Sequence, residues 1–67
     1  MQIKFKESYD TQLTDEDGEF VQNINWKAGD VEECRTSDTY VSGVQLEFPD
    51  GTIADNVPNR VFEVIKQ

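Results

Sequence analysis

The stretch of sequence that decides the fold is Val44-Gln-Leu-Glu-Phe48-Pro-Asp-Gly51-Thr-Ile-Ala-Asp-Asn-Val57-Pro58-Asn-Arg-Val-Phe62-Glu-Val-Ile65. Apolar and polar residues alternate on both sides of Asp50-Gly51, a pair that favours a tight primed turn between two strands. Val57-Pro58-Asn59-Arg60 predicts a one-turn helical corner, and the residues after it predict a closing strand. This order of elements is typical of the end of a very small β-barrel.

The rest of the chain shows period-two alternation, in which every second residue is apolar, as in half-buried strands. Ile3 and Phe5 alternate with polar neighbours in the first such segment. No segment has the length and the spacing of apolar residues that predict a helix. We therefore expect short strands at residues 2–6, 20–26, 31–35, 40–48, 53–57 and 61–66.

Polar, turn-prone segments separate these strands. Residues 8–19 predict a loop in which Leu13 is the one apolar anchor. Residues 27–30 predict a turn, and residues 36–39 predict a polar tip. Gly43 indicates a β-bulge inside its strand.

Five or six short strands in 67 residues predict one domain, residues 1–67, of the all-β class and folded as a small barrel. Closure of a barrel hides the strand edges that a flat sheet would expose. Trp26 shares its strand face with apolar residues, and it either packs in the core or anchors an interface. The expected core is Ile3, Phe5, Phe20, Ile24, Trp26, Val31, Val44, Leu46, Phe48, Ile53, Val57, Phe62 or Val64, and Ile65.

Charge and cysteine content restrict the partners and the compartment. The net charge is −8, and such a surface repels phosphate backbones and anionic membranes, so we expect no nucleic acid and no membrane as partner. It suits a soluble protein whose protein partner has a basic patch. The sequence has neither an apolar run of about 18 residues nor a charged-then-apolar leader. Cys34 is the only cysteine, which predicts a reducing compartment and hence the cytoplasm.

The residue inventory predicts no enzyme, no cofactor and no metal. The chain has no histidine, so no imidazole can act as a general base or as a zinc ligand. Residues 15–19 form an acidic run, but an EF-hand calcium loop would place Leu13 and Ile24 at its first and last ligand positions. We therefore interpret the run as a solvated turn. Cys34 has acidic neighbours that raise the pKa of a thiol, and we interpret it as a small core or wall residue.

Three segments resemble the Src-homology-3-like barrel family in order and approximate spacing. Phe5-Lys-Glu-Ser-Tyr9-Asp10 resembles the family's alanine-leucine-tyrosine-aspartate segment in the first strand. Ile24-Asn-Trp26-Lys-Ala-Gly29-Asp30-Val31 is similar to its leucine-x-phenylalanine-x-x-glycine-aspartate strand and turn. Val57-Pro58-Asn59-Arg60-Val61-Phe62-Glu63-Val64-Ile65 is similar to its proline, one-turn helix and closing strand. The resemblance covers most of the chain, and it implies a Src-homology-3-like barrel with a one-turn helix before the last strand.

The resemblance also implies a groove for proline-rich peptides, which the family lines with aromatic side chains. This chain has Val61 where the family has a tyrosine after the proline, and no tryptophan opens the strand at residues 31–35. The groove residues that remain are Tyr9, Tyr40 and Pro58.

The leading functional hypothesis is a non-enzymatic protein–protein interaction module. The alternative is a structural or accessory subunit, either a homo-oligomer or part of a larger complex, because a core this small gains stability by association. A third hypothesis is an acidic mimic of nucleic acid, although the carboxylates concentrate in residues 15–19 instead of spreading over one face. The resemblance also suggests a bacterial or phage protein. The residues expected at the interface are Tyr9, Tyr40 and Pro58 as apolar contacts, with Asp15, Glu16 and Asp17 steering the encounter.

Overall fold

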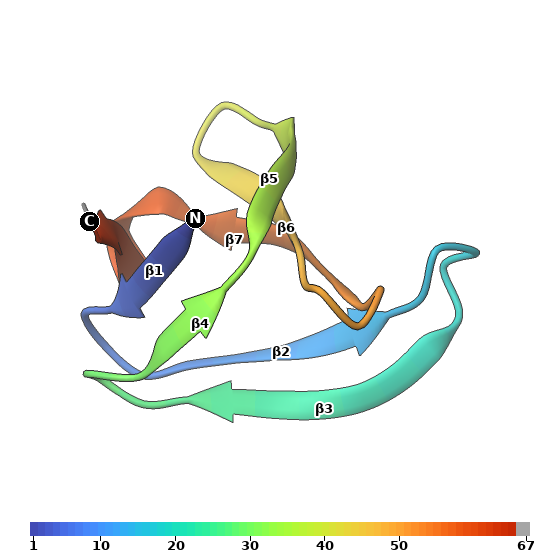
Figure 1. Ribbon diagram of the computed structural model, residues 1–67, viewed down its shortest axis with the longest axis horizontal. Coiled ribbons are helices and arrows are strands. Elements are labelled where there is room, and N and C mark those ends of the chain that lie inside the picture. The colour runs from blue at the N-terminus through green and yellow to red at the C-terminus, as the bar shows by residue number, and fades with distance from the viewer. Residues whose placement is uncertain (66–67) are drawn as a thin grey trace.

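The computed structural model describes residues 1–65, which form an all-β molecule (Figure 1). This range contains eight short strands and one turn of 3-10 helix, η1. As the sequence predicted, the helical turn directly precedes the last strand. The elements are β1 (Gln2–Phe5), β2 (Tyr9–Thr14), β3 (Phe20–Trp26), β4 (Val31–Glu33), β5 (Arg35–Thr39), β6 (Gly43–Glu47), β7 (Ile53–Pro58), η1 (Asn59–Val61) and β8 (Phe62–Ile65).

The strands form two antiparallel sheets. The smaller sheet has the order β4-β1-β8, and the larger has the order β3-β2-β7-β6-β5. The strand expected at residues 31–35 is interrupted at Cys34, so that β4 pairs with β1 whereas β5 pairs with β6. Figure 1 shows the chain passing directly from β4 into β5. The β4–β5 segment and η1 each connect the smaller sheet to the larger one. The apolar side chains of both sheets form one buried cluster between them.

The interior is a single cluster of apolar side chains. Phe5 stacks on Trp26 with ring centroids 4.4 Å apart, and the rings of Trp26 and Phe48 are 5.8 Å apart. Trp26 is only 3% exposed, which settles the choice between core and interface in favour of the core. The buried residues are Ile3, Phe5, Leu13, Trp26, Cys34, Val44, Leu46, Phe48, Ala54, Val57, Val61 and Phe62.

The prediction that Phe20 is buried is wrong, and its side chain is 57% exposed. The cause is a shift in the register between β2 and β3. Leu13 pairs with Gln22 but Thr14 pairs with Phe20, so Val21 is an extra residue in β3. An extra residue reverses the face to which the following side chains point. Phe20 therefore lies opposite Thr14, on the other face from Leu13.

The prediction that Val31 is buried is also wrong. Val31 pairs with Lys4 across β1 and β4, so it shares the outer face with that lysine. Its neighbour Glu32 pairs with Ile3, whose side chain is fully buried. Directly paired residues of antiparallel strands share one face, so a carboxylate takes the inward position that the sequence pattern assigned to a valine.

The remaining core predictions are confirmed only in part. Of the two alternatives in β8, Phe62, which pairs with Phe5, is buried, and Val64 is exposed. Ile24, Ile53 and Ile65 are half-buried. Four buried residues lie outside the predicted core, namely Leu13, predicted as a loop anchor, Cys34, predicted as a core or wall residue, and Ala54 and Val61.

Two segments predicted as loops are strands. Within residues 8–19, β2 pairs with β3 on one side and with β7 on the other, and only the residues after Thr14 form a turn. Alternate residues of β2, including Thr11 and Leu13, are less exposed than their neighbours, which is the alternation of a strand made with polar side chains. The predicted polar tip at residues 36–39 belongs to β5, which pairs with β6. Pairing with a neighbouring strand thus outweighs local composition in both segments.

The bulge expected at Gly43 lies in the neighbouring strand. Val44 pairs with Val57 but Leu46 pairs with Ala54, so β7 holds the extra residue. Asn56 in this part of β7 has φ of 49°, a left-handed conformation that asparagine adopts more readily than most residues. Gly43 instead permits close packing, because a Cβ there would lie 2.7 Å from the carbonyl oxygen of Val57.

Candidate functional site

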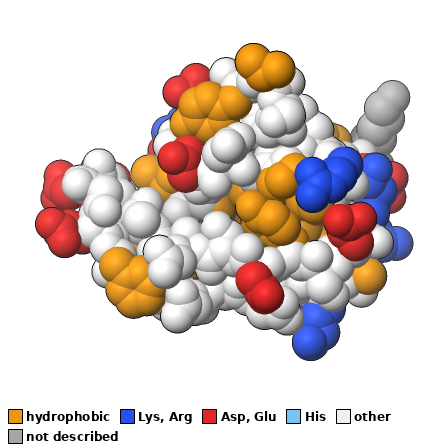
Figure 2. All heavy atoms as spheres, turned by 180° about the vertical axis from the view of Figure 1, so that it is seen from behind, with side chains coloured by type: hydrophobic (Ala, Val, Ile, Leu, Met, Phe, Trp, Pro, Cys, Tyr) orange, Lys and Arg blue, Asp and Glu red, His pale blue; other side chains and the backbone are white. Residues whose placement is uncertain are grey.

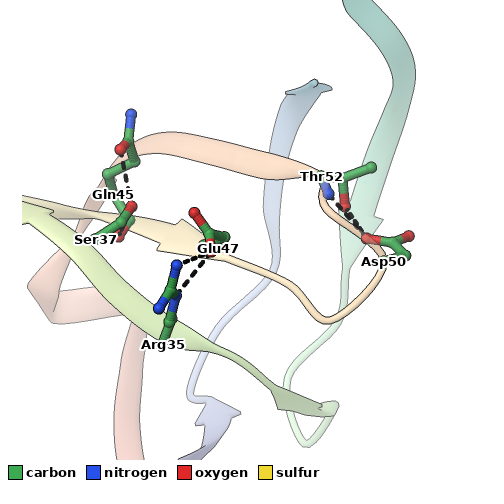
Figure 3. Close-up of polar contacts among 6 residues, drawn as sticks. All are labelled: Arg35, Ser37, Gln45, Glu47, Asp50 and Thr52. Atoms are coloured by element: carbon green, nitrogen blue, oxygen red, sulfur yellow. Dashed lines mark hydrogen bonds and ion pairs between the residues drawn. The ribbon is translucent and has the colours of Figure 1, made fainter. Parts of the chain in front are cut away.

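The turn between β6 and β7 is held by its own side chains. Gly51 donates its N–H to the carbonyl of Phe48 at 2.9 Å, and its φ is 91°. Asp50 does not share this positive φ, so the backbone is a type I turn followed by a left-handed glycine and not the predicted primed turn. Asp50 Oδ1 accepts hydrogen bonds from the N–H and the hydroxyl of Thr52 at 3.0 and 2.6 Å (Figure 3). The hydroxyl bond, followed by the N–H bond, lowers the pKa of the Asp50 carboxyl.

The acidic run forms the turn between β2 and β3. Asp15 Oδ1 accepts hydrogen bonds from the backbone N–H groups of Asp17 and Glu19, both at 2.9 Å. Asp15 therefore holds the turn in shape, whereas Glu16 and Asp17 are exposed. Glu16 Oε1 lies 3.9 Å from the position that a Cβ on Gly51 would take. The two tight turns are thus neighbours at one end of the molecule (Figure 1).

A hollow of about 350 Å³, here called the β3–β4 hollow, lies between β3, β4 and the β6–β7 turn. Its floor is apolar and its rim is acidic. Among residues 1–65, no lysine or arginine lines it. The apolar lining is Leu13, Ile24, Trp26, Phe48 and Pro49, and the polar lining is Gln22, Glu32, Glu33, Asp50 and Thr52.

A second hollow adjoins the first, because both are lined by Asp50 and Thr52. Its volume is about 450 Å³, and the acidic turn of residues 15–17 forms one of its walls. Within the described part of the chain, this hollow also has no basic residue in its lining. Carboxylates from two turns and from β4 therefore line two adjoining hollows.

Glu32 is the carboxylate with the least favourable surroundings. Its side chain is half-buried on the inward-facing side of β4. Burial raises the pKa of the Glu32 carboxyl, and the carboxylates of Asp30 and Asp50 raise it further. Among residues 1–65, no hydrogen bond and no ion pair is made to this carboxylate. The hollow therefore holds a negative charge that no described residue neutralises.

The indole of Trp26 supplies a second unpaired polar group. Its Nε1 is buried and has no hydrogen-bond acceptor among residues 1–65. Buried donors are normally paired, so an unpaired one needs an explanation. Trp26 is part of the floor of the β3–β4 hollow, and its ring is otherwise fixed by stacking on Phe5.

The basic residue that follows β4 is paired with a carboxylate outside the hollow. Arg35 follows β4 directly, but its Nε donates to Glu47 Oε1 at 2.7 Å on the neighbouring strand (Figure 3). Beside this pair, the Ser37 hydroxyl bonds the side chain of Gln45 at 2.8 Å. Figure 2 shows most lysine and arginine side chains at the end opposite the β2–β3 turn, whereas acidic side chains are spread over the whole face. In this view, the basic residues are therefore more localised than the acidic ones.

Tyr9, the first residue of the predicted groove, lies beside Trp26 at the edge of the core. Tyr9 begins β2, is half-buried, and pairs with Trp26 of β3. Its ring packs against the core cluster. Tyr9 does not line the β3–β4 hollow.

Tyr40 and Pro58 both lie beside Gly43. The Tyr40 N–H donates to the Gly43 carbonyl at 2.8 Å, and Gly43 pairs with Pro58. The Tyr40 hydroxyl donates to Asp55 Oδ1 at 2.7 Å. This hydrogen bond is the main cause that raises the pKa of Tyr40 to about 12. Both side chains are half-buried, so each still presents part of its surface to solvent.

The one thiol of the chain is that of Cys34. Cys34 is buried, and burial raises the pKa of its thiol, with Glu33 and Glu32 opposing the lowering effect of the N-terminal ammonium. A thiol with a raised pKa is a poor nucleophile. Among residues 1–65, no three His, Cys, Asp or Glu side chains are grouped so as to hold a metal ion. In the same range, no helix is long and apolar enough to cross a membrane.

No protein-family model, curated protein sequence or solved structure matches this chain. Its function is therefore inferred from its own residues.

The sequence pattern identifies the acidic turn but misses the other members of the hollow. It assigns Asp50 only to a hairpin turn, and it places Glu32 only beside the thiol. The signal for Asp50 is present in the sequence, because aspartate two residues before threonine in a turn favours a fixed carboxylate. The inward position of Glu32 follows from the β1–β4 register, which depends on residues distant in sequence.

Proposed function

We propose that this chain is a non-enzymatic protein-interaction module, built as a Src-homology-3-like barrel, that binds a basic segment of a partner protein in the β3–β4 hollow. The observation that supports the proposal is an apolar floor beneath carboxylates that no described residue neutralises. The helical turn η1 before β8 is the element that the family resemblance implies, and it supports the barrel type. The cytoplasm is the compartment that suits the free, buried thiol of Cys34.

The chemistry of the hollow favours an arginine or lysine side chain as the group that enters it. Both have a long apolar stem that packs on apolar surface while the charged head stays near polar groups. In the hollow, the stem would lie on Ile24 and Phe48, and the head would meet Glu32 and Asp50. Arginine fits best, because its planar guanidinium bonds two carboxylate oxygens at once. The acidic turn would steer the encounter, so the association rate should fall as salt rises.

Trp26 allows a direct test, because the one tryptophan gives a single indole signal in NMR and in fluorescence. The probe is the acetylated and amidated peptide Pro-Leu-Arg-Leu-Pro, and its control has citrulline in place of arginine, which keeps the shape and removes the charge. We expect the arginine peptide to shift the Trp26 indole and the amides of Glu32 and Asp50. Citrulline should abolish most of the shift. Equal shifts with both peptides, or none with either, would contradict the proposal.

Variants of the rim localise the binding. Glu32→Gln and Asp50→Asn keep the size of each side chain, and both should weaken binding of the arginine peptide. Glu63→Gln is the matched control, because Glu63 is exposed on β8 and does not line the hollow. Equal weakening by all three would show that only the overall charge matters.

The predicted groove of Tyr9, Tyr40 and Pro58 is tested in the same titration with a proline-rich peptide that has no basic residue. Shifts at these residues that are lost in Tyr9→Ala and Tyr40→Ala would place a second interface there. Their absence, together with arginine-dependent shifts at Trp26, would leave the β3–β4 hollow as the site.

A further inference from the structure

The β3 strand has an open edge. It stands at the end of the larger sheet, where only β2 pairs with it among residues 1–65. Figure 1 shows it as the outermost strand at the lower border of the molecule. With seven residues it is also the longest strand of the described chain. Its outer edge therefore presents backbone groups that a further strand can pair with.

Natural proteins usually protect such edges with charged residues, proline or short length. The other edge strands here follow this rule: β4 has three residues, two of them glutamate, β5 contains Arg35 and Asp38, and β8 has only four residues. In contrast, β3 contains no charged residue, no proline and no glycine. Apart from the extra residue Val21, β3 has none of these protections, so we expect its edge to be covered by a partner strand.

The charge pattern around β3 fits a second copy of the same strand. The strand is uncharged, but Glu19 precedes it and Lys27 follows it. When two β3 strands run antiparallel with Asn23 facing Asn23, all seven residues overlap, and each Glu19 faces Lys27 of the other copy. Both side chains are exposed, and the only partner of the Lys27 ammonium among residues 1–65 is the Asn25 amide oxygen at 3.3 Å.

We propose that β3 pairs with β3 of a second copy across a two-fold axis at Asn23, forming a symmetric dimer with one continuous sheet. Self-complementarity of a single patch is what a two-fold interface requires. Net repulsion between two acidic chains is screened beyond about 8 Å at physiological ionic strength, so contacts at the seam decide the association. The proposal goes beyond the binding of a basic segment, since it uses the strand edge and not the hollow.

The central test places charges on the axis. Asn23 is exposed and points away from the core, so substitutions there should leave the fold intact. We expect the wild type and Asn23→Thr to show a concentration-dependent rise to twice the monomer mass in sedimentation equilibrium. Asn23→Lys and Asn23→Asp should each remain monomeric, because like charges then face each other. An equimolar mixture of the two should recover the dimer, because the charges become opposite.

Trp26 fluorescence and the unfolding midpoint check that each variant is folded. A second pair of variants tests the ends of the seam. Lys27→Glu should weaken the dimer, whereas Arg60→Glu, which makes the same change of charge in η1, should not. A wild type that stays monomeric at every accessible concentration would overturn the proposal. A dimer that survives Asn23→Asp, or a Lys–Asp mixture that stays monomeric, would overturn the β3 seam.

Discussion

The core built from β1, β6, β7 and β8 and the hairpin of β2 and β3 differ in how they are held together. The four core strands contain most of the fully buried side chains, such as Phe5, Leu46 and Val57. In the hairpin only Leu13 and Trp26 are buried, most side chains of β3 are exposed, and Phe20 is 57% exposed. Backbone pairing holds the outer hairpin, whereas apolar burial holds the core. The polar hairpin is therefore free to present charge and an open edge.

The largest expected effect comes from removing one aromatic ring from the core, with the removal of one ring from the hairpin as the comparison. Phe5→Ala should lower the free energy of unfolding by about 3–5 kcal/mol, the usual range for a buried phenylalanine. Such a loss rivals the total stability of a small domain. Phe20→Ala should change it by no more than about 0.5 kcal/mol, as for other exposed positions. Urea unfolding followed by Trp26 fluorescence, at concentrations where the chain is monomeric, measures both. Similar losses in the two variants would show that the hairpin is part of the core.

A smaller effect is expected when glycines are replaced. In Gly43→Ala the new Cβ would lie 2.6 Å from Asn56 Oδ1 and 2.7 Å from the Val57 carbonyl oxygen, so the backbone of β7 must move. Overpacking of this kind costs about 1–3 kcal/mol. Gly18 in the acidic turn has φ of 84°, and a Cβ added there would meet nothing within 4 Å, so Gly18→Asn should cost less than about 1 kcal/mol. Thermal unfolding measures the stability of both variants. A lower melting temperature for Gly18→Asn than for Gly43→Ala would contradict the difference expected between the core and the hairpin.

The difference between the core strands and the β2–β3 hairpin also explains which parts of the structure the sequence predicts correctly. In β1 and β6, the buried apolar residues keep a period of two, so Ile3, Phe5 and Leu46 were placed correctly. The one-turn helix at Pro58 was also predicted, because its cause lies within a few residues. In the hairpin, the extra residue Val21 reverses the pattern, and nothing in the local sequence marks it.

The candidate site was predictable only in part, for the same reason. The acidic turn is a local feature, and its position next to a glycine identifies it. Its proximity to Asp50, and the inward direction of Glu32, depend on the pairing of strands that are far apart in sequence. The unpaired Nε1 of Trp26 likewise depends on how the ring packs.

The smallest expected effect is a pH dependence of stability that arises from Glu32 in the β3–β4 hollow. The pKa of Glu32 is raised above its ordinary value of 4.5 in the folded protein, mainly by burial. A raised pKa means that the folded state binds the proton more tightly than the unfolded state. The favourable contribution of Glu32 to the free energy of unfolding is therefore fully present below pH 4.5. It is lost as the pH rises through the raised pKa of Glu32. Glu32→Gln should remove this loss, so the variant should be more stable than the wild type at neutral pH.

The difference between Glu32→Gln and the wild type should vanish below the ordinary glutamate pKa, where both side chains are neutral. The effect is small because Glu32 is partly exposed and solvent screens its charge. Glu63→Gln is again the control, since it removes one negative charge from an exposed position and reports the general effect of net charge. Urea unfolding at several pH values measures all three proteins. Identical pH profiles for the two variants would show that the hollow imposes no particular cost on Glu32. A Glu32→Gln protein that is more stable yet binds the arginine peptide less well would show that the carboxylate is kept for binding at the expense of stability.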